Sequence, residues 1–168
     1  KRMEDTPAFI NPAYPNGRDV QYGEGIFVGY RYYDKRDIAP LFPFGHGLSY
    51  TSFAYGPVQM AESAQIGAPV EVMVTIQNTG SQAGKEVVQL YVHDVVSSVP
   101  KAPRELKRFA KVALKPGEST TVVFTLDARC FAYYDPYRKD WVVEPGVYEV
   151  QAGSSSRDIR SKAQITLA

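Results

Sequence analysis

Residues 69–92 read PVEVMVTIQNTGSQAGKEVVQLYV, and this stretch decides the fold. Branched aliphatic residues occupy every second position from Val70 to Ile76, and the alternation returns from Val88 to Val92. A period of two is typical of a strand with one buried face. Between the two runs lies a turn signal at Asn78-Thr79-Gly80. The stretch therefore predicts two strands joined by a turn, each with one apolar face.

The same alternation recurs toward the C-terminus, in the runs 122–126, 148–152 and 163–167. The turn signals between them are Lys115-Pro116-Gly117-Glu118 and Glu144-Pro145-Gly146-Val147, in which proline restricts φ and glycine permits positive φ. A first strand is expected near 53–59 and a less regular one over 106–114. About seven short strands without a good helical stretch predict an all-β, two-sheet sandwich.

Residues 1–52 do not share this pattern. Turn signals such as Asn16-Gly17 are frequent, and residues 25–34 (GIFVGYRYYD) predict a single strand. One strand and several turns cannot form a core alone. We therefore expect this segment to pack on the sandwich or on another domain. The opening Lys-Arg-Met-Glu-Asp is neither an initiator methionine nor a signal peptide, which predicts that the chain is the end of something longer.

Composition excludes several classes of function. The 168 residues carry 19 basic and 18 acidic side chains, a net charge of +1 that gives no global attraction to nucleic acid or to an anionic membrane. The basic run from Lys101 to Lys115 is better explained as a charged edge strand. A single cysteine, Cys130, and two histidines predict neither disulfides nor a metal site. The composition is compatible with a secreted, periplasmic or cytoplasmic location.

No residue stands out as catalytic, substrate-binding or metal-binding. His46 lies between two glycines and could serve as a general base, but a hydrogen-bonding role is the more economical interpretation. Paired carboxylates perform glycoside hydrolysis. The available candidates lie among turns or beside basic residues, where a solvated, salt-paired surface explains them: Glu24, Asp34, Asp37, Asp135 and Asp140.

Aromatic residues are concentrated in two places, residues 22–55 and 131–141. Aromatic faces can stack on sugar rings, but they also suit domain interfaces. We expect packing across the sandwich end for the second group. For the first group we expect interdomain packing, and the residues predicted to take part are Tyr30, Tyr32, Phe42, Phe44, His46 and Tyr50.

Several ungapped motifs resemble the C-terminal part of glycoside hydrolase family 3 β-glucosidases. The first two are YGEGIFVGYRYYD at 22–34 and PFGHGLSYT at 43–51, followed by Phe53. Three further motifs resemble the fibronectin type III-like domain of that family: GKEVVQLYV at 84–92, PRELK at 103–107 with Phe109, and WVVEPGVY at 141–148. The motifs occur in the family's order and extend over essentially the whole chain.

The resemblance implies a domain division and a role. Residues 1–52 would be an extended tail of an α/β sandwich domain with an interdomain linker, and residues 53–168 an immunoglobulin/fibronectin type III-like sandwich. The partners would be the upstream (β/α)8 barrel and α/β sandwich domains of the same retaining β-glucosidase, which hydrolyses terminal β-D-glucosides without a cofactor.

In this family the nucleophilic aspartate belongs to the barrel and the acid/base glutamate to the α/β sandwich domain, upstream of these motifs. The chain would therefore be a structural, interdomain-packing part and not itself catalytic. The alternative is a free-standing β-sandwich module that binds carbohydrate or protein.

Overall fold

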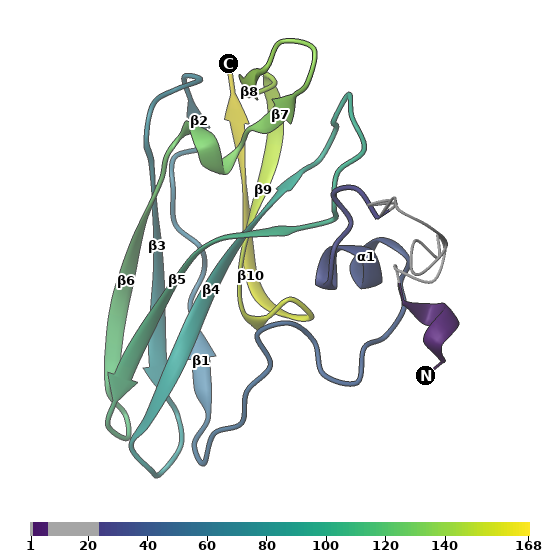
Figure 1. Ribbon diagram of the computed structural model, residues 1–168. Helices are drawn as coiled ribbons and strands as arrows, with labels where there is room; N and C mark the ends of the chain where they lie inside the picture. Colours follow the sequence, from purple (N-terminus) through teal and green to yellow (C-terminus); the bar gives the residue numbers. More distant parts are fainter. Residues whose placement is uncertain (1, 7–23) are drawn as a thin grey trace.

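The computed structural model describes residues 2–6 and 24–168, and it is a sandwich of two sheets (Figure 1). The smaller sheet has the strand order β1-β3-β6, formed by Phe53–Tyr55, Val70–Asn78 and Ser119–Leu126. The larger sheet has the order β2-β10-β9-β4-β5, formed by Ser63–Ala64, Asp158–Leu167, Gly146–Ser155, Gly84–Asp94 and Glu105–Leu114. The all-β sandwich predicted from the sequence is confirmed.

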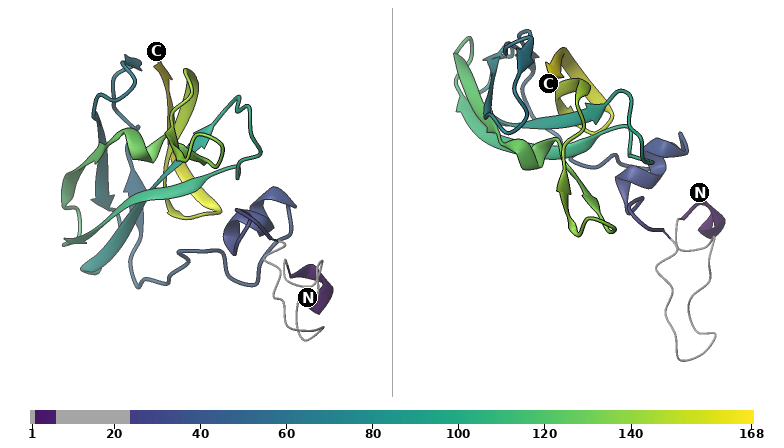
Figure 2. Two further views of the ribbon diagram at one scale, coloured as in Figure 1. Left: turned by 45° about the horizontal axis from the view of Figure 1, so that its top comes forward. Right: turned by 90° about the horizontal axis from the view of Figure 1, so that it is seen from above.

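Three smaller elements and a hairpin complete the described chain. The helical elements are η1 (Met3–Asp5), α1 (Tyr30–Lys35) and η3 (Ala128–Cys130). The hairpin consists of β7 (Tyr133–Asp135) and β8 (Asp140–Val142), which pair antiparallel with each other. It projects from the body of the sandwich, as the right-hand view in Figure 2 shows.

The core lies between the two sheets and follows the predicted alternation. In β3 every second residue from Val70 to Asn78 is buried, and the intervening residues are exposed. On the neighbouring strand β6 of the same sheet, the inward residues are Val122, Phe124 and Leu126. The larger sheet contributes core residues such as Leu90, Val150 and Ile165. Burial of these apolar side chains is the main stabilising contribution to the sandwich.

The edge of the larger sheet is the basic strand expected there. β5 pairs only with β4, in a register that sets Gly84 opposite Leu114. Lysine and arginine side chains on an edge strand discourage pairing with another chain. None of the helices in the described part of the chain is long and apolar enough to span a bilayer.

Residues 25–34 do not form the single strand that the sequence predicted. Gly25 and Gly29 adopt positive φ values of 56° and 60°, which end any extended path, and Tyr30–Lys35 form the short helix α1. The segment also has no neighbouring strand with which to pair in the described chain. Strand propensity of aromatic and β-branched residues is therefore overridden here by glycine geometry and by packing.

The serine run 154–156 is not a solvated polar loop, although three consecutive serines are typical of one. Ser154 and Ser155 belong to β9, and Ser155 and Ser156 are buried. The polar groups are buried because residues 24–50 pass over this part of the sheet, as the hydrogen bonds described below establish.

Candidate functional site

The outer face of the larger sheet changes character halfway along β4. In the first half of the strand, outward residues are exposed, whereas all residues from Val88 to Val92 are buried. The inward side chains contact the core. The outward ones, Gln89 and Tyr91, are covered by residues 24–50. We call this contact between residues 24–50 and the outer face of the larger sheet the seam.

Tyr30 anchors α1 to the seam. Its hydroxyl oxygen accepts a hydrogen bond of 2.9 Å from the backbone N–H of Leu106 in β5. Its ring stacks on Phe44, with 4.6 Å between centroids, and meets Tyr91 edge to face at 6.3 Å. Aromatic pairs in these arrangements contribute about 0.5–1.5 kcal/mol beyond the area that they bury. Tyr30 therefore connects α1, the loop after it and the sheet.

Gln89 fixes the path of the loop that contains Gly45. Its side-chain N–H groups donate to the carbonyl oxygens of Gly45 and Ser154, and its Oε1 accepts from the hydroxyl of Tyr91 at 2.6 Å. Gly45 has a φ of 82°, and a Cβ placed there would lie 2.1 Å from Gln89 Oε1. Only glycine combines this backbone conformation with so close an approach.

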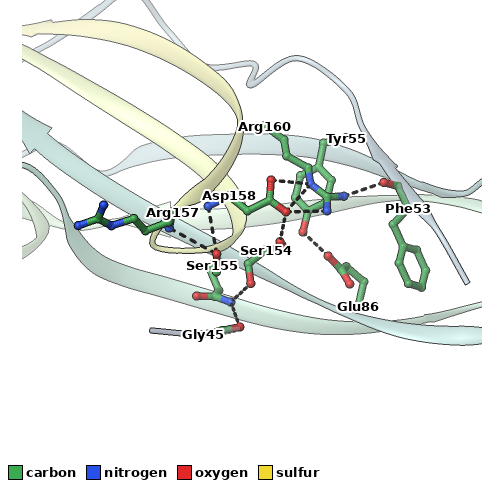
Figure 3. Close-up of polar contacts among 10 residues, drawn as sticks. Gly45, Phe53, Tyr55, Glu86, Ser154, Ser155, Arg157, Asp158 and Arg160 are labelled. Atoms are coloured by element: carbon green, nitrogen blue, oxygen red, sulfur yellow. Dashed lines mark hydrogen bonds and ion pairs between the residues drawn. The ribbon is translucent and has the colours of Figure 1, made fainter. Parts of the chain in front are cut away.

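Arg157 lies at the turn between β9 and β10 (Figure 3) and binds residues 33–38. Its Nε lies 2.8 Å from Asp34 Oδ1, and its Nη2 donates to the carbonyl oxygens of Tyr33 at 2.9 Å and Ile38 at 3.2 Å. These carbonyls belong to the end of α1 and the turn that follows, where backbone acceptors lack helical partners. A single guanidinium thus holds a carboxylate and two backbone groups about 120 positions away in the chain.

Several polar groups of the seam are buried. Burial, together with the carboxylate of Asp34 and the nearby Tyr30, raises the pKa of Tyr91 above its usual range. For Glu105, burial would raise the pKa, but the charge and hydrogen bond of Lys107 outweigh it and hold the pKa below the usual range. Four side-chain atoms are buried here without a hydrogen-bond partner: Arg31 Nε, Asp34 Oδ2, Arg104 Nε and Ser156 Oγ.

The six aromatic and histidine residues predicted for interdomain packing divide into two groups. Tyr30 and Phe44 stack on each other at the seam, although Phe44 remains 45% exposed, and Tyr32 is only 8% exposed. Phe42, His46 and Tyr50 are exposed, and the imidazole of His46 stacks on the ring of Phe42 at 5.4 Å. Sequence reasoning missed Gln89 and Arg157, since neither residue type nor spacing distinguishes them from surface residues.

The structure brings four of the five carboxylates considered for hydrolysis together two by two, since Asp34 and Asp37 both contact Arg157 and Asp135 lies opposite Asp140 in the β7–β8 hairpin. Asp34 was expected on a salt-paired, solvated surface, but its side chain is only 5% exposed and pairs with Arg157. Asp135 pairs with Arg138 and accepts from backbone N–H groups of its own turn. Among residues 2–6 and 24–168, no three histidine, cysteine, aspartate or glutamate side chains gather closely enough to hold a metal ion.

A second candidate site is a cavity of about 820 Å³ beside the β7–β8 hairpin. It lies between the hairpin, the connection that follows β4 and the first half of β5, and we call it the hairpin groove. Phe131 packs edge to face on Tyr148 in the core, as expected for the second aromatic group. Tyr134, Tyr137 and Trp141 of the same group do not pack in the core, because their exposed fractions are 48%, 96% and 43%.

Comparison with known proteins gives consistent matches. A family model described as "Fibronectin type III-like domain" matches residues 86–156. The chain is 53% identical over 166 residues to thermostable β-glucosidase B of Acetivibrio thermocellus. The aligned region covers 98% of this chain and 22% of that protein. It is 43% identical over 163 residues to a β-glucosidase of Bacteroides ovatus, covering 95% of this chain and 22% of the relative.

Solved structures agree with these relatives. The Bifidobacterium adolescentis GH3 β-glucosidase superposes with a TM-score of 0.89 at 44% identity, covering 98% of this chain and 24% of that one. A β-D-glucoside glucohydrolase from Trichoderma reesei superposes with a TM-score of 0.81 at 34% identity, covering 91% and 24%. The chain thus spans less than a quarter of each of these relatives. It therefore belongs to the glycoside hydrolase family 3 β-glucosidases, as a C-terminal portion that contains their fibronectin type III-like domain.

Proposed function

We propose that this chain is the C-terminal, interdomain-packing part of a retaining β-glucosidase that hydrolyses terminal β-D-glucosides. In this proposal residues 1–52 complete an α/β sandwich domain and link it to the fibronectin type III-like domain of residues 53–168. The β-glucosidase names of the relatives support the activity, which belongs to the complete enzyme. The partners are the upstream (β/α)8 barrel and α/β sandwich domains, and the glucoside is bound through them.

The observation that carries the proposal is the uneven burial of residues 24–50. Part of this segment covers Gln89 and Tyr91 and is held by Arg157. Other residues of the segment leave large apolar side chains in solvent, with exposed fractions of 79% for Leu41, 94% for Leu48 and 101% for Tyr50. A run of exposed apolar residues is typical of a surface that another domain covers.

The chain itself is proposed to have no hydrolytic activity. A retaining glycosidase needs two carboxyl groups about 5–5.5 Å apart, one as nucleophile and one as acid/base. Two of the carboxylates considered for hydrolysis are held in ion pairs, Asp34 with Arg157 and Asp135 with Arg138. The resemblance to the family assigns both catalytic carboxyl groups to positions upstream of the motifs in this chain. The seam would then have no catalytic role and would fix the position of the fibronectin type III-like domain relative to the domain before it.

Hydrolysis of an aryl β-glucoside tests the proposal directly. The complete protein that contains this chain should release the aryl alcohol, and the purified 168-residue chain should not do so above the buffer background. Turnover by the purified chain that persists through repeated chromatography would refute the assignment of both carboxyl groups to the missing domains. An inactive complete protein that is folded would refute the β-glucosidase activity itself.

A further inference from the structure

The hairpin groove combines exposed aromatic rings with a dense set of polar groups. Its walls carry Tyr134, Tyr137 and Trp141, and its floor includes the buried rings of Phe131 and Tyr148. The volume of about 820 Å³ lies within the range of about 300–1,000 Å³ usual for small-ligand sites. None of these three exposed rings belongs to the core, and none takes part in the seam contacts of the described residues. Within the described chain they can therefore contact a ligand.

Charges in the groove are compensated within the groove or next to it. Each lining carboxylate has a basic partner within 4 Å: Asp94 with Lys101, Glu105 with Lys107 and Arg31, Asp127 with Arg108, and Asp135 with Arg138. Such a site offers many hydrogen-bond donors and acceptors but little net charge. It fits a neutral, hydroxyl-rich ligand better than a polyanion, which would require an excess of unpaired cations.

Arg129 is the lining cation for which no carboxylate partner is seen in the described residues. Its guanidinium lies over the indole of Trp141, 3.1 Å from the ring centroid, and Tyr134 meets the same indole at 5.4 Å between centroids. Cation–π and aromatic contacts of this kind hold side chains in one orientation. The indole is thereby fixed on one face by Arg129, while its remaining exposed surface and the ring of Tyr134 border the groove.

We propose that the hairpin groove binds a neutral oligosaccharide built from hexoses with equatorial hydroxyl groups. In such sugars the ring faces present C–H groups that stack on aromatic rings, and the hydroxyl groups at the ring edge exchange hydrogen bonds with charged side chains. Tyr134 and Trp141 supply the aromatic surface, and the guanidinium edge of Arg129 supplies donors. A site of this kind would hold a glucan chain against the fibronectin type III-like domain.

The test uses Trp141 as its own reporter, because it is the only tryptophan in the chain. The 168-residue chain is titrated with cellotetraose, a neutral β-linked glucose tetramer whose choice rests on the proposed function, and tryptophan fluorescence is recorded. We expect a saturable change with half-saturation at or below about 1 mM. Tyr134→Ala and Arg129→Gln should each weaken binding at least about tenfold.

Phe109→Ala is the matched control. Phe109 is an exposed aromatic on β5, with 69% of its surface accessible, and it does not line the groove. This variant should bind cellotetraose as the parent does. Thermal melting confirms that every variant is folded. If Tyr134→Ala melts early, Arg129→Gln decides the outcome.

Three results would overturn the inference. The first is the absence of any saturable change up to about 10 mM cellotetraose in the folded parent chain. The second is equal binding by the parent and both groove variants. The third is a response only to an acidic oligosaccharide or to a proline-rich peptide. Each leaves hydrolysis by the complete protein untouched, so failure of this site and failure of the proposed function are distinguishable.

Discussion

Replacement of Arg157 by methionine should release residues 24–50 from the sandwich without unfolding it. The change removes the partner of Asp34, whose side chain is only 5% exposed, and frees the carbonyls of Tyr33 and Ile38. Removing one member of a buried ion pair costs about 3–5 kcal/mol. Since Arg157 is 26% exposed and water can replace part of its role, we expect a loss of about 2–3 kcal/mol in docking free energy. That corresponds to an increase of about 30- to 140-fold in the open population.

Hydrogen exchange measured by mass spectrometry reads this opening directly. The amides of Arg36 and Ile38, which donate to Tyr32 and Tyr33 at 3.0 and 2.9 Å, should exchange faster by the same factor. Amides in the β3–β6 ladder should be unaffected, because they lie in the other sheet.

Arg160→Met is the control for loss of an arginine near the same turn. Arg160 pairs with Asp158 and donates to the carbonyl of Phe53, and none of its hydrogen bonds or ion pairs reaches residues 24–50 (Figure 3). This variant should leave α1 exchange unchanged. In the double variant Asp34→Asn, Arg157→Met, the increase in α1 exchange should be smaller than the product of the increases in the two single variants. The double variant leaves no buried charge unpaired, so the two effects are not independent. Unchanged exchange in α1 of Arg157→Met would refute this role of Arg157.

Three further predictions concern other parts of the chain. Phe44 is 45% exposed and stacked on Tyr30, so Phe44→Ala should weaken the docking of residues 24–50 on the sandwich by about 1–2 kcal/mol in hydrogen-exchange measurements. A tenfold fall in kcat/KM of the complete enzyme at unchanged Tm would instead place this loop at the substrate. Asn78→Ala should lower the free energy of unfolding by about 2–4 kcal/mol in denaturant titrations. The reason is that the fully buried amide donates to Leu114 and Gln82 and accepts from Thr51 and Gly80. Gln77→Ala, at an exposed position of the same strand, should change that free energy by less than about 0.5 kcal/mol. Burial lowers the pKa of His93 despite the nearby Glu149 and Asp94, so the unfolded state binds more protons than the folded state. The free energy of unfolding should therefore fall as pH drops below about 6.5, and His93→Gln should reduce that fall. An identical pH profile for the variant would show that His93 does not cause the fall.

Part of the seam was accessible from the sequence. The density of aromatic residues in 22–55 and the lack of a core there predicted interdomain packing, which stays a prediction; in the structure Tyr30 stacks on Phe44 and meets Tyr91 of the sandwich. The partners of these residues were not predictable. Gln89 occupies an ordinary outward position of a strand, and Arg157 follows a serine run typical of a loop. Only the fold brings Arg157 to Asp34, 123 positions earlier in the chain.

The sequence by itself determined the sandwich, because a period of two records which residues of a strand face the core. It could not determine whether the other face of that strand is covered. Val88–Val92 are buried on both faces although their pattern resembles that of β3, and residues 25–34 form a turn and a helix although their composition favours a strand. Tertiary structure decided both, since burial of an outward face depends on which distant segment lies over it. Local periodicity contains no information about that segment.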